Sequence, residues 1–346
     1  MPQRALAVAL RRVAVSAAAA SCTMNLSTAC AAGQYVIATD GLAKSSTESA
    51  KEFLLSRPSG AYTTARTCCG ATRLFEWETH VTRTASSVAG MLQGEEQKSA
   101  AGALEALSKP ELLRPRLDAT VSSAVREYES LNGKDGELKV TILVTWGEAA
   151  GKADAETVGS IACHVAPLPA LPLPPVRVEA RGAPRANAEA KASSWVAERA
   201  PLEALMRQSA VGEVNELLLA TESGEVLEGS QTNFFAVIDG AVHTAGDGVL
   251  AGTVRRLLLE VCEREGIPVV LRPPKLSEAP RWEGALISST SRLLLPVDEL
   301  YVPAEGAPSG EGDCRVRFDN APSSLAAKLR EAVLGEIEAH SSEISK

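Results

Sequence analysis

The chain has 346 residues, of which 45% are hydrophobic and 23% are charged, and its formal net charge is −8. This composition is typical of a globular protein long enough for two domains, and it excludes global disorder. The acidic balance and the aromatic content of 4% argue against binding to nucleic acid or to an anionic membrane. Its apolar stretches are shorter than the roughly 18 residues that a membrane span needs. We therefore expect small-molecule partners, with no nucleic acid and no membrane.

Cysteine and histidine usage gives no sign of a metal or disulfide framework. The seven cysteines stand at scattered spacings without a CxxC pair, and the four histidines lack metal-ligand spacing. An odd number of scattered cysteines predicts neither a disulfide scaffold nor a zinc site. We expect reduced thiols and no bound metal.

Residues 1–39 differ from the rest of the chain. They contain Arg4, Arg11 and Arg12 and many small residues, with no acidic residue before Asp40. This profile is typical of an organellar transit peptide. The stretch "VAVSAAAASC" leaves a secretory signal as an alternative, although the cysteine usage does not suit an oxidising compartment. We expect 1–39 to be a targeting segment for a chloroplast or mitochondrion. The alternative is an unstructured N-terminus of a cytoplasmic protein, with no targeting role.

A small N-terminal α+β domain is predicted over 40–166. The elements expected there are strands at 62–67 and 73–77, helices from about 79 and over about 109–131, and strands within 137–146 and 157–168. The run "PLPALPLPPV" follows, and it is neither helix nor central strand because each proline lacks an amide donor and restrains its neighbour. We assign 167–180 to a linker.

A larger C-terminal domain is predicted over 181–346. The elements expected there are a helix within 191–208, a two-stranded hairpin within 217–240, a helix within 251–266, strands within 268–274 and 284–297, and a closing helix over 323–340. Hairpins mixed with helices indicate an α+β fold rather than alternating βαβ units.

The hairpin at 217–240 holds polar residues where an apolar core is expected. Glu228 and Asn233 flank "GSQT" between the apolar segments "LLLAT" and "FFAVI". A buried carboxylate must be paired or hydrogen-bonded. A solvated turn is the alternative, but the turn signal "ESGE" already lies upstream, at 222–225. We therefore expect at least one of the two side chains to point inward.

Two segments are candidate phosphate sites. "LAGTVRR" places Gly252 and Thr253 at a helix start, where backbone amides point outward, and "ISSTSR" offers hydroxyls at 288–290 in a turn. His80 and Arg83 stand three residues apart on one face of a helix that follows a strand. Each feature also has a purely structural interpretation: a helix cap at 252–253, an ordinary turn at 288–290, and a solvated helix face at His80 and Arg83. Taken together they predict one phosphate held by amides, hydroxyls and an arginine.

In this order the features resemble the class IV pyridoxal-phosphate-dependent aminotransferases. This fold type IV family includes branched-chain and D-amino-acid aminotransferases and aminodeoxychorismate lyase. The motifs that carry the resemblance are "YTTART…RLFEWETHVTR", the lysine of "EAKASSW", "EGSQTN", "AGTVRR" and "SST" followed by "LLLPV". The resemblance covers roughly four-fifths of the chain and implies a two-domain α+β fold of the D-amino-acid aminotransferase type. It also implies pyridoxal 5′-phosphate between the domains, and a homodimer.

The resemblance implies roles for individual residues. Lys191 corresponds to the family's lysine that forms the Schiff base with the cofactor. Arg83 corresponds to the arginine that binds the cofactor phosphate, and Glu228 corresponds to the carboxylate that pairs with the pyridine nitrogen. An anionic carboxylate beside that nitrogen keeps it protonated, and a protonated ring withdraws electrons from the substrate. The other residues assigned to the site are Thr253, Val254, Ser289 and Thr290 for the cofactor, and Tyr62, Arg66 and Asn233 for the substrate.

The chain also departs from the family pattern. The family often has a tyrosine five residues after the lysine, where Val196 stands here beside Trp195.

The predicted activity is transamination of a small amino acid with a 2-oxo acid. The alternatives are an aminodeoxychorismate lyase, which uses the same lysine and cofactor, and a non-catalytic relative that acts as a binding protein. Retention of Lys191, Glu228 and Arg83 together favours an enzyme.

Overall fold

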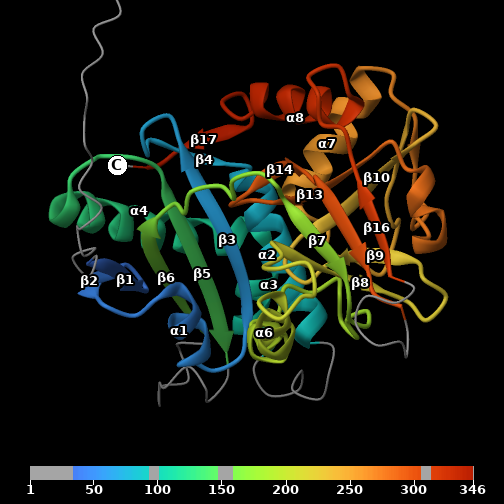
Figure 1. Cartoon of the computed structure of the whole chain (residues 1–346). Helices are drawn as coiled ribbons and strands as arrows, with labels where there is room; N and C mark the ends of the chain where they lie inside the picture. Colours follow the sequence, from blue (N-terminus) through green and yellow to red (C-terminus); the bar gives the residue numbers. More distant parts are fainter. Residues whose placement is uncertain (1–33, 93–100, 147–158, 305–312, 346) are drawn as a thin grey trace, which may run out of the picture. The chain divides into compact units, whose positions relative to one another are not determined.

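The computed structural model describes residues 34–92, 101–146, 159–304 and 313–345, with the side chains of 101–103 excepted. A seven-stranded antiparallel sheet occupies its N-terminal part, in the order β17-β4-β3-β5-β6-β1-β2. Its strands are β1 (Tyr35–Thr39), β2 (Leu42–Ser46), β3 (Ala61–Cys68), β4 (Arg73–Phe75), β5 (Leu138–Trp146), β6 (Gly159–Pro167) and β17 (Ser341–Glu343). Figure 1 shows this sheet with α4 alongside it.

Helices pack on both faces of this sheet. The helices of the N-terminal part are α1 (Ala50–Leu55), α2 (Trp77–Leu92), α3 (Ala101–Ser108) and α4 (Pro110–Asn132). Helices α2, α3 and α4 cover one face, whereas α1 packs on the other face, beside Ile37 and Leu143. Alternate residues of β5, namely Val140, Ile142 and Val144, pack with buried residues of α2 and α4 in one hydrophobic cluster. Because side chains alternate along a strand, Lys139 and Thr141 point to the opposite face, where they line the cavity described below.

A ten-stranded mixed sheet forms the C-terminal part, with the order β12-β11-β10-β9-β8-β7-β15-β16 and with β13 pairing both β10 and β14. Its strands are β7 (Arg177–Ala180), β8 (Glu216–Ala220), β9 (Val226–Gly229), β10 (Asn233–Ile238), β11 (Ala241–His243), β12 (Val269–Val270), β13 (Gly284–Ser289), β14 (Leu293–Pro296), β15 (Glu299–Val302) and β16 (Cys314–Arg317). The helices are α5 (Ser194–Glu198), α6 (Ala200–Met206), α7 (Thr253–Arg264), the 3-10 helix η2 (Leu276–Arg281) and α8 (Leu325–Gly335).

Helices α7 and α8 pack against the C-terminal sheet. The buried face of α7, with Leu257, Leu258 and Val261, joins residues of β10, β13 and α8 in one hydrophobic cluster. Gly252 caps the start of α7 in an extended conformation, and Gly266 follows its end with a φ of +67°. This conformation suits glycine because it lacks a Cβ atom. The packing fixes the first turn of α7 against β10 and β13.

The N-terminal boundary of the fold lies earlier than predicted. Residues 35–39, which we assigned to the targeting segment, form β1, and Val36, Ile37 and Ala38 are buried in the sheet. The apolar run "YVIA" was obscured by the alanine-rich sequence before it. The targeting prediction for 1–33 lies outside the described residues. Strand β2 and helix α1 were also not expected.

Several predicted elements are divided or shorter than expected. The stretch 191–208 forms α5 and α6 rather than one helix, because Pro201 lacks the amide that would continue α5. The stretch 217–240 forms three strands, and 284–297 forms two strands joined by a turn at 290–292. The strand expected in 268–274 shrinks to β12 because prolines flank it.

The ends of other elements also differ. The strand expected at 73–77 stops at Phe75, and α2 begins at Trp77 rather than 79. The closing helix ends at Gly335, a poor helix former, well before 340. Strand β7 occupies the last part of the predicted linker, 167–180.

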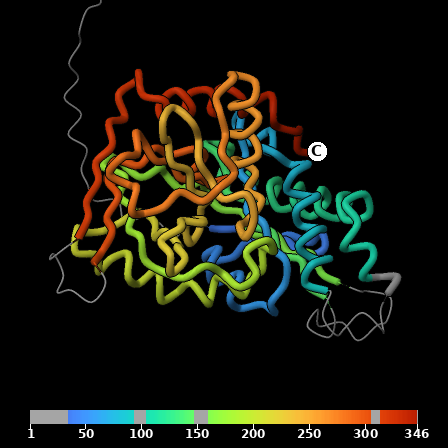
Figure 2. Tube along the Cα trace, turned by 90° about the vertical axis from the view of Figure 1, so that its right-hand side faces the viewer, coloured from blue at the N-terminus to red at the C-terminus, as the bar shows by residue number. Residues whose placement is uncertain are grey.

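The C-terminal segment returns to the N-terminal sheet. Strand β17 pairs with β4, with Ser341 opposite Phe75, although we assigned 181–346 to the C-terminal domain. Figure 2 shows this return in the red trace that ends at the mark C. A three-residue strand is too short to show a period in sequence. Among the described residues, no helix combines the length and apolarity that a bilayer crossing needs.

Candidate active site

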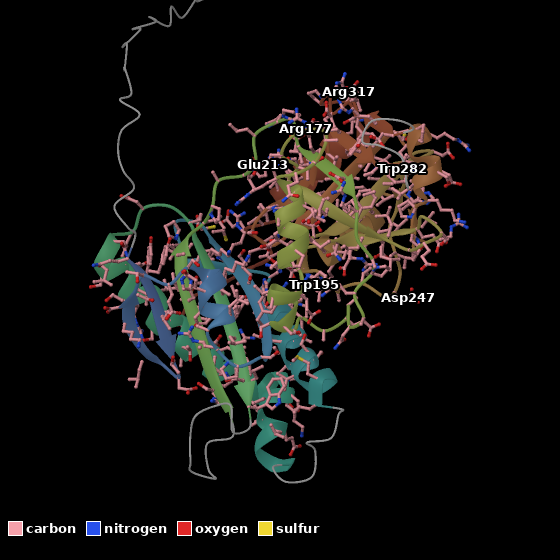
Figure 3. The ribbon with its side chains drawn as sticks, turned by 60° about the horizontal axis from the view of Figure 1, so that its bottom comes forward. Arg177, Trp195, Glu213, Asp247, Trp282 and Arg317 are labelled. Carbon is pink, nitrogen blue, oxygen red and sulfur yellow. The ribbon has the colours of Figure 1, made fainter. Side chains whose placement is uncertain are left out.

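One cavity of about 410 Å³ brings together residues from both sheets. Nine of the ten residues predicted for the site line it: Tyr62, Arg83, Lys191, Glu228, Asn233, Thr253, Val254, Ser289 and Thr290. They come from β3, α2, the segment before α5, β9, β10, α7, the end of β13 and the turn that follows it. Trp195, another lining residue, lies where the N-terminal sheet meets the C-terminal elements (Figure 3).

Arg66 is the predicted residue that the structure does not bring to the cavity. It lies on β3, on the same face as Tyr62 and Thr64, which both line the cavity. A strand advances by about 3.3 Å per residue, which carries Arg66 roughly 7 Å past Thr64. Its Nε atom donates to the carbonyl of Thr67 at 3.4 Å. Arg66 therefore stands outside the described lining.

Lys191 is held between α2 and β3 through its backbone. Its amide donates to the Ser87 hydroxyl at 3.2 Å, and its carbonyl accepts from the amide of Tyr62 at 2.8 Å. Its Nζ atom lies 4.6 Å from the centre of the Tyr62 ring. Burial lowers the pKa of Lys191 to about 8, since the positive charge of Arg83 adds to an effect that Tyr62 only partly opposes. The lysine is therefore close to losing its proton at neutral pH.

Tyr62 is paired with an arginine that the sequence analysis missed. The Nη1 atom of Arg199 lies 3.4 Å from the Tyr62 hydroxyl oxygen and donates to it. Burial would raise the pKa of this phenol, but the charges on Lys191 and Arg199 outweigh it and lower that pKa to about 8. Arg199 stands at the break between α5 and α6, and no sequence motif marks it.

Glu228 is held by a second arginine that was missed. The Nε and Nη2 atoms of Arg185 lie 2.8 Å and 2.7 Å from one carboxylate oxygen, and both side chains are less than a tenth exposed. The amide of Leu250 donates to the other oxygen at 3.2 Å. Burial raises the pKa of Glu228, while Arg185 works in the opposite direction. Arg185 lies in "APRANAEA", the segment just before Lys191.

Asn233, on β10, holds the segment before α7 in place by a hydrogen bond. It stands opposite Glu228 in the β9–β10 pairing, and its Nδ2 atom donates to the carbonyl of Leu250 at 2.8 Å. A Cβ atom on Gly252 would lie only 2.0 Å from Oδ1 of Asn233, so only glycine fits there. The residue predicted for the substrate therefore also positions the helix start.

Arg83 brings a buried charge close to the start of α7. Its Nη2 atom donates to Thr63 Oγ1 at 2.9 Å, and its Nη1 atom donates to the carbonyl of Ala251 at 3.2 Å. Burial lowers the pKa of Arg83 to about 10, so the group stays charged at neutral pH. His80 is fully buried, and its Nδ1 atom lies 2.7 Å from the same Thr63 hydroxyl. Burial, with the charge on Arg83, lowers the pKa of His80 well below its ordinary value.

The donors near Arg83 fit a phosphate group. Thr253 Oγ1 and Thr290 Oγ1 lie 2.9 Å apart, and the first amides of α7 have no partner within the helix. Ser289 Oγ accepts from the amide of Arg292 at 3.3 Å. Two buried polar atoms here, Nε of Arg83 and Oγ of Ser288, have no hydrogen-bond partner among the described residues. Uncommitted donors beside a helix N-terminus are what a bound phosphate requires.

The cavity is strongly cationic in a chain of net charge −8. Its one described lining carboxylate is Glu228, and its lining cations are Lys51, Arg83, Lys139, Arg185, Lys191, Arg199 and Arg292. Four of these cations pair with carboxylates: Lys51 and Arg199 with Glu203, Arg185 with Glu228, and Arg292 with Glu216. The field in the cavity therefore favours ligands with several negative charges.

The fold and the site define a pyridoxal-phosphate-dependent enzyme of fold type IV. The family model for amino-transferase class IV matches residues 60–300, which is more than half of the chain. The chain belongs to the class IV aminotransferase family. It is a pyridoxal-phosphate-dependent aminotransferase. No curated protein matches the sequence.

Solved structures of similar fold come from several microorganisms. A branched-chain aminotransferase from Thermoproteus uzoniensis, solved with norvaline, has a TM-score of 0.64 at 19% identity, covering 90% of this chain and 100% of its own. A fold IV transaminase from Curtobacterium pusillum has a TM-score of 0.62 at 20% identity, with coverages of 88% and 99%. A hypothetical aminotransferase from Mycobacterium tuberculosis, solved in its PLP-bound form, has a TM-score of 0.61 at 18% identity, with coverages of 88% and 99%. At these identities the likeness shows the fold.

Proposed function

We propose that this aminotransferase acts on a small amino acid and a 2-oxo acid, with Lys191 as the residue that bonds covalently to the cofactor. One observation supports this most directly: Lys191 and Glu228 line the same cavity as Arg83 and the start of α7. These groups match the aldehyde, the ring nitrogen and the phosphate of pyridoxal phosphate in kind.

Each part of the cofactor has residues that suit it. Arg83, the amides of Thr253 and Val254, and the hydroxyl of Thr290 would hold the phosphate. Glu228 would face the ring nitrogen, and the positive charge of Arg185 partly opposes the rise that burial causes in the pKa of that carboxylate. When bound, the cofactor supplies an electron sink for the charge that develops at Cα of the amino acid.

Lys191 moves the proton at the substrate Cα. Because its pKa is lowered to about 8, a useful fraction of its amine is unprotonated at neutral pH and accepts a proton. The resulting ammonium group would then donate this proton to the cofactor, which leaves Lys191 neutral again at the end of the half-reaction. The Tyr62 phenol lies beside the Lys191 amine and raises its pKa, whereas the positive charge of Arg199, which donates to that phenol, lowers it.

The cavity suits a small substrate that carries an α-carboxylate. Both partners of a transamination carry an α-carboxylate, which the cationic lining attracts. The cavity of about 410 Å³ would have to hold the cofactor as well as the substrate, which favours a substrate with a small side chain. Trp195 and Leu171 provide apolar contacts on the lining.

We also propose a homodimer and an organellar location, both of which rest on the sequence. Sedimentation of the purified protein tests the first, and an import assay with the full chain tests the second. A monomer that is fully active would overturn the dimer, and retention in the cytoplasm would overturn the organellar location.

The half-reactions of the purified protein test the proposed activity. With pyridoxal phosphate bound, an amino donor alone should convert the cofactor to pyridoxamine phosphate, and a 2-oxo acid should restore the original absorption spectrum. Release of pyruvate and 4-aminobenzoate from aminodeoxychorismate, with no pyridoxamine phosphate from common L- or D-amino acids, would replace transamination by lyase activity. Absence of both reactions would leave only a binding role.

A further inference from the structure

A buried glutamate that does not line the cavity has an unusual set of partners. Glu76 lies between β4 and α2, and its side chain is 2% exposed. Arg256 donates to both of its carboxylate oxygens, from Nη2 at 2.5 Å and from Nε at 3.3 Å. The hydroxyl of Thr79 donates to one oxygen at 2.5 Å, and Nδ1 of His340 lies 2.9 Å from the other. The carboxylate thus has one partner nearby in the chain, Thr79, and two that are distant in the chain, Arg256 and His340.

The backbone of Glu76 is held in an unfavourable conformation. Its φ of +54° lies in the left-handed region, which residues with side chains other than Asn and Asp rarely adopt. Its amide donates to the carbonyl of His340 at 2.7 Å, and its carbonyl accepts from the amide of His80 at 3.0 Å. Strain of this kind persists only where the surroundings over-determine it, and it often marks a functional position.

One partner of Glu76, Arg256, lies in the helix turn that borders the proposed phosphate site. Arg256 is in the first turn of α7, with its amide bonded to the carbonyl of Gly252 at 3.0 Å, and the amides of Thr253 and Val254 belong to the same turn. Glu76 also directly precedes α2, the helix that carries Arg83, and its carbonyl accepts from the amide of His80 in that helix. The ion pair therefore ties the start of α2 to the start of α7.

Glu76 also acts on Arg83 through its charge. Burial lowers the pKa of Arg83, and the negative charge of Glu76 opposes that effect. The C-terminal segment completes the arrangement, because His340 precedes β17, which pairs with β4. Arg73 adds a further tie, donating from Nε to the carbonyl of Ser341 at 3.1 Å.

From this geometry we propose that Glu76 is a positioning residue for the cofactor phosphate. Through Arg256 it sets the spacing between Arg83 and the amides of Thr253 and Val254, and His340 holds it in place. This inference rests on the proposed phosphate site, but it concerns residues that do not line the cavity. A pair that merely stabilises the fold would not discriminate between ligands with and without a phosphate.

The test compares three ligands on the protein freed of cofactor: pyridoxal phosphate, inorganic phosphate and pyridoxal. The variants are Glu76→Gln and Arg256→Gln. The matched control is Glu260→Gln, because Glu260 lies on the same helix as Arg256 and its carboxylate is the other ion-pair partner of Arg256, with Oε2 at 2.9 Å from Nη1. Residues without ligand contact change binding by about 2- to 30-fold. We expect about a tenfold loss of affinity for pyridoxal phosphate and for inorganic phosphate in both variants, with pyridoxal unchanged within about twofold.

Two outcomes would overturn the inference. One is an unfolding temperature that falls while the affinities for phosphate and pyridoxal phosphate stay the same, which would make the pair purely structural. The other is an equal loss for all three ligands, which would mean a general loosening of the site. If Glu76→Gln does not fold, Arg256→Gln decides, because that side chain is 47% exposed. Wild-type protein that binds no pyridoxal phosphate would instead defeat the proposed function itself.

Discussion

The cavity contains two sets of residues that handle charge in different ways. The reacting set consists of Tyr62, Arg185, Lys191, Arg199 and Glu228. The phosphate set consists of Arg83, Thr253, Val254 and Thr290. The first set is made of ion pairs and of groups with shifted pKa values, whereas the second relies on neutral hydroxyls and amides around a single arginine.

The difference separates two tasks. Proton transfer needs groups whose pKa lies near the working pH, and Tyr62 and Lys191 both have a pKa of about 8. Holding a phosphate needs only fixed donors, which neither gain nor lose protons. Changes in the reacting set should therefore affect rates at saturating cofactor. Changes in the phosphate set should affect cofactor affinity.

The largest effect is expected from Lys191→Ala. Loss of the amine removes both the covalent link to the cofactor and the proton carrier, so the half-reaction should slow by roughly 10²–10⁴-fold. Rapid spectral measurement with an amino donor gives the rate, and borohydride treatment should no longer fix the cofactor to the protein. Lys139→Ala is the matched control, because that lysine lines the same cavity and should leave the fixation intact. A borohydride label on another lysine of the wild type would contradict the assignment.

Glu228→Gln should have the next largest effect. A neutral amide stabilises a protonated ring nitrogen less well, and a nearby opposite charge is worth about 1–3 pKa units. Both half-reactions should slow by roughly ten- to a thousandfold, while cofactor affinity changes much less. Stopped-flow spectra of each half-reaction measure this. Slowing of one half alone would contradict a role at the ring nitrogen.

Arg83→Ala should show the opposite pattern. A charge-assisted bond to phosphate is worth about 1.5–3 kcal/mol, so affinity for pyridoxal phosphate should fall by roughly tenfold or more. At saturating cofactor the half-reactions should keep most of their rate. Absorbance titration and single-turnover kinetics separate the two quantities. Unchanged affinity would place the phosphate elsewhere, and a rate loss at saturation would break the division between the two sets.

The two sets were not equally predictable from sequence. Lys191, Glu228 and Arg83 were found because each stands at a fixed place in a local motif. Arg185 and Arg199 were missed because they reach the cavity only through tertiary packing, and their own segments carry no distinguishing pattern.

The fold shows the same limit. Long periodic elements such as α4 and β5 were predicted nearly in full, whereas short strands such as β2, β16 and β17 were not. The bond between Glu76 and His340 joins residues 264 positions apart, and local periodicity does not report such a contact. Arg66 was assigned to the site from sequence, and it does lie on the same face of β3 as Tyr62. It is too far along the strand, however, to line the cavity.

A smaller effect is expected from Tyr62→Phe, seen in the pH dependence of cofactor capture by the protein freed of cofactor. Protonated Lys191 cannot attack the aldehyde, so capture should rise with pH to a midpoint near its pKa of about 8. Tyr62 raises the pKa of Lys191, so removing the phenol should move the midpoint to lower pH. The ultraviolet absorbance should also lose a phenol that titrates with a pKa of about 8. A midpoint that stays fixed would show that Tyr62 does not act on Lys191.

The smallest effect is expected from removing residues 1–33, which touches neither set. A chain beginning at Gln34 keeps β1, with its buried Val36 and Ile37, and should match the full chain in unfolding temperature and in affinity for pyridoxal phosphate. A chain beginning at Gly41 loses this strand. Because each buried aliphatic side chain contributes about 1.5–3 kcal/mol, it should unfold at a distinctly lower temperature or fail to accumulate. Thermal unfolding and cofactor titration of both chains measure this. Loss of folded protein on the shorter deletion would show that 1–33 contributes to the core, and equal stability of both chains would show that β1 does not.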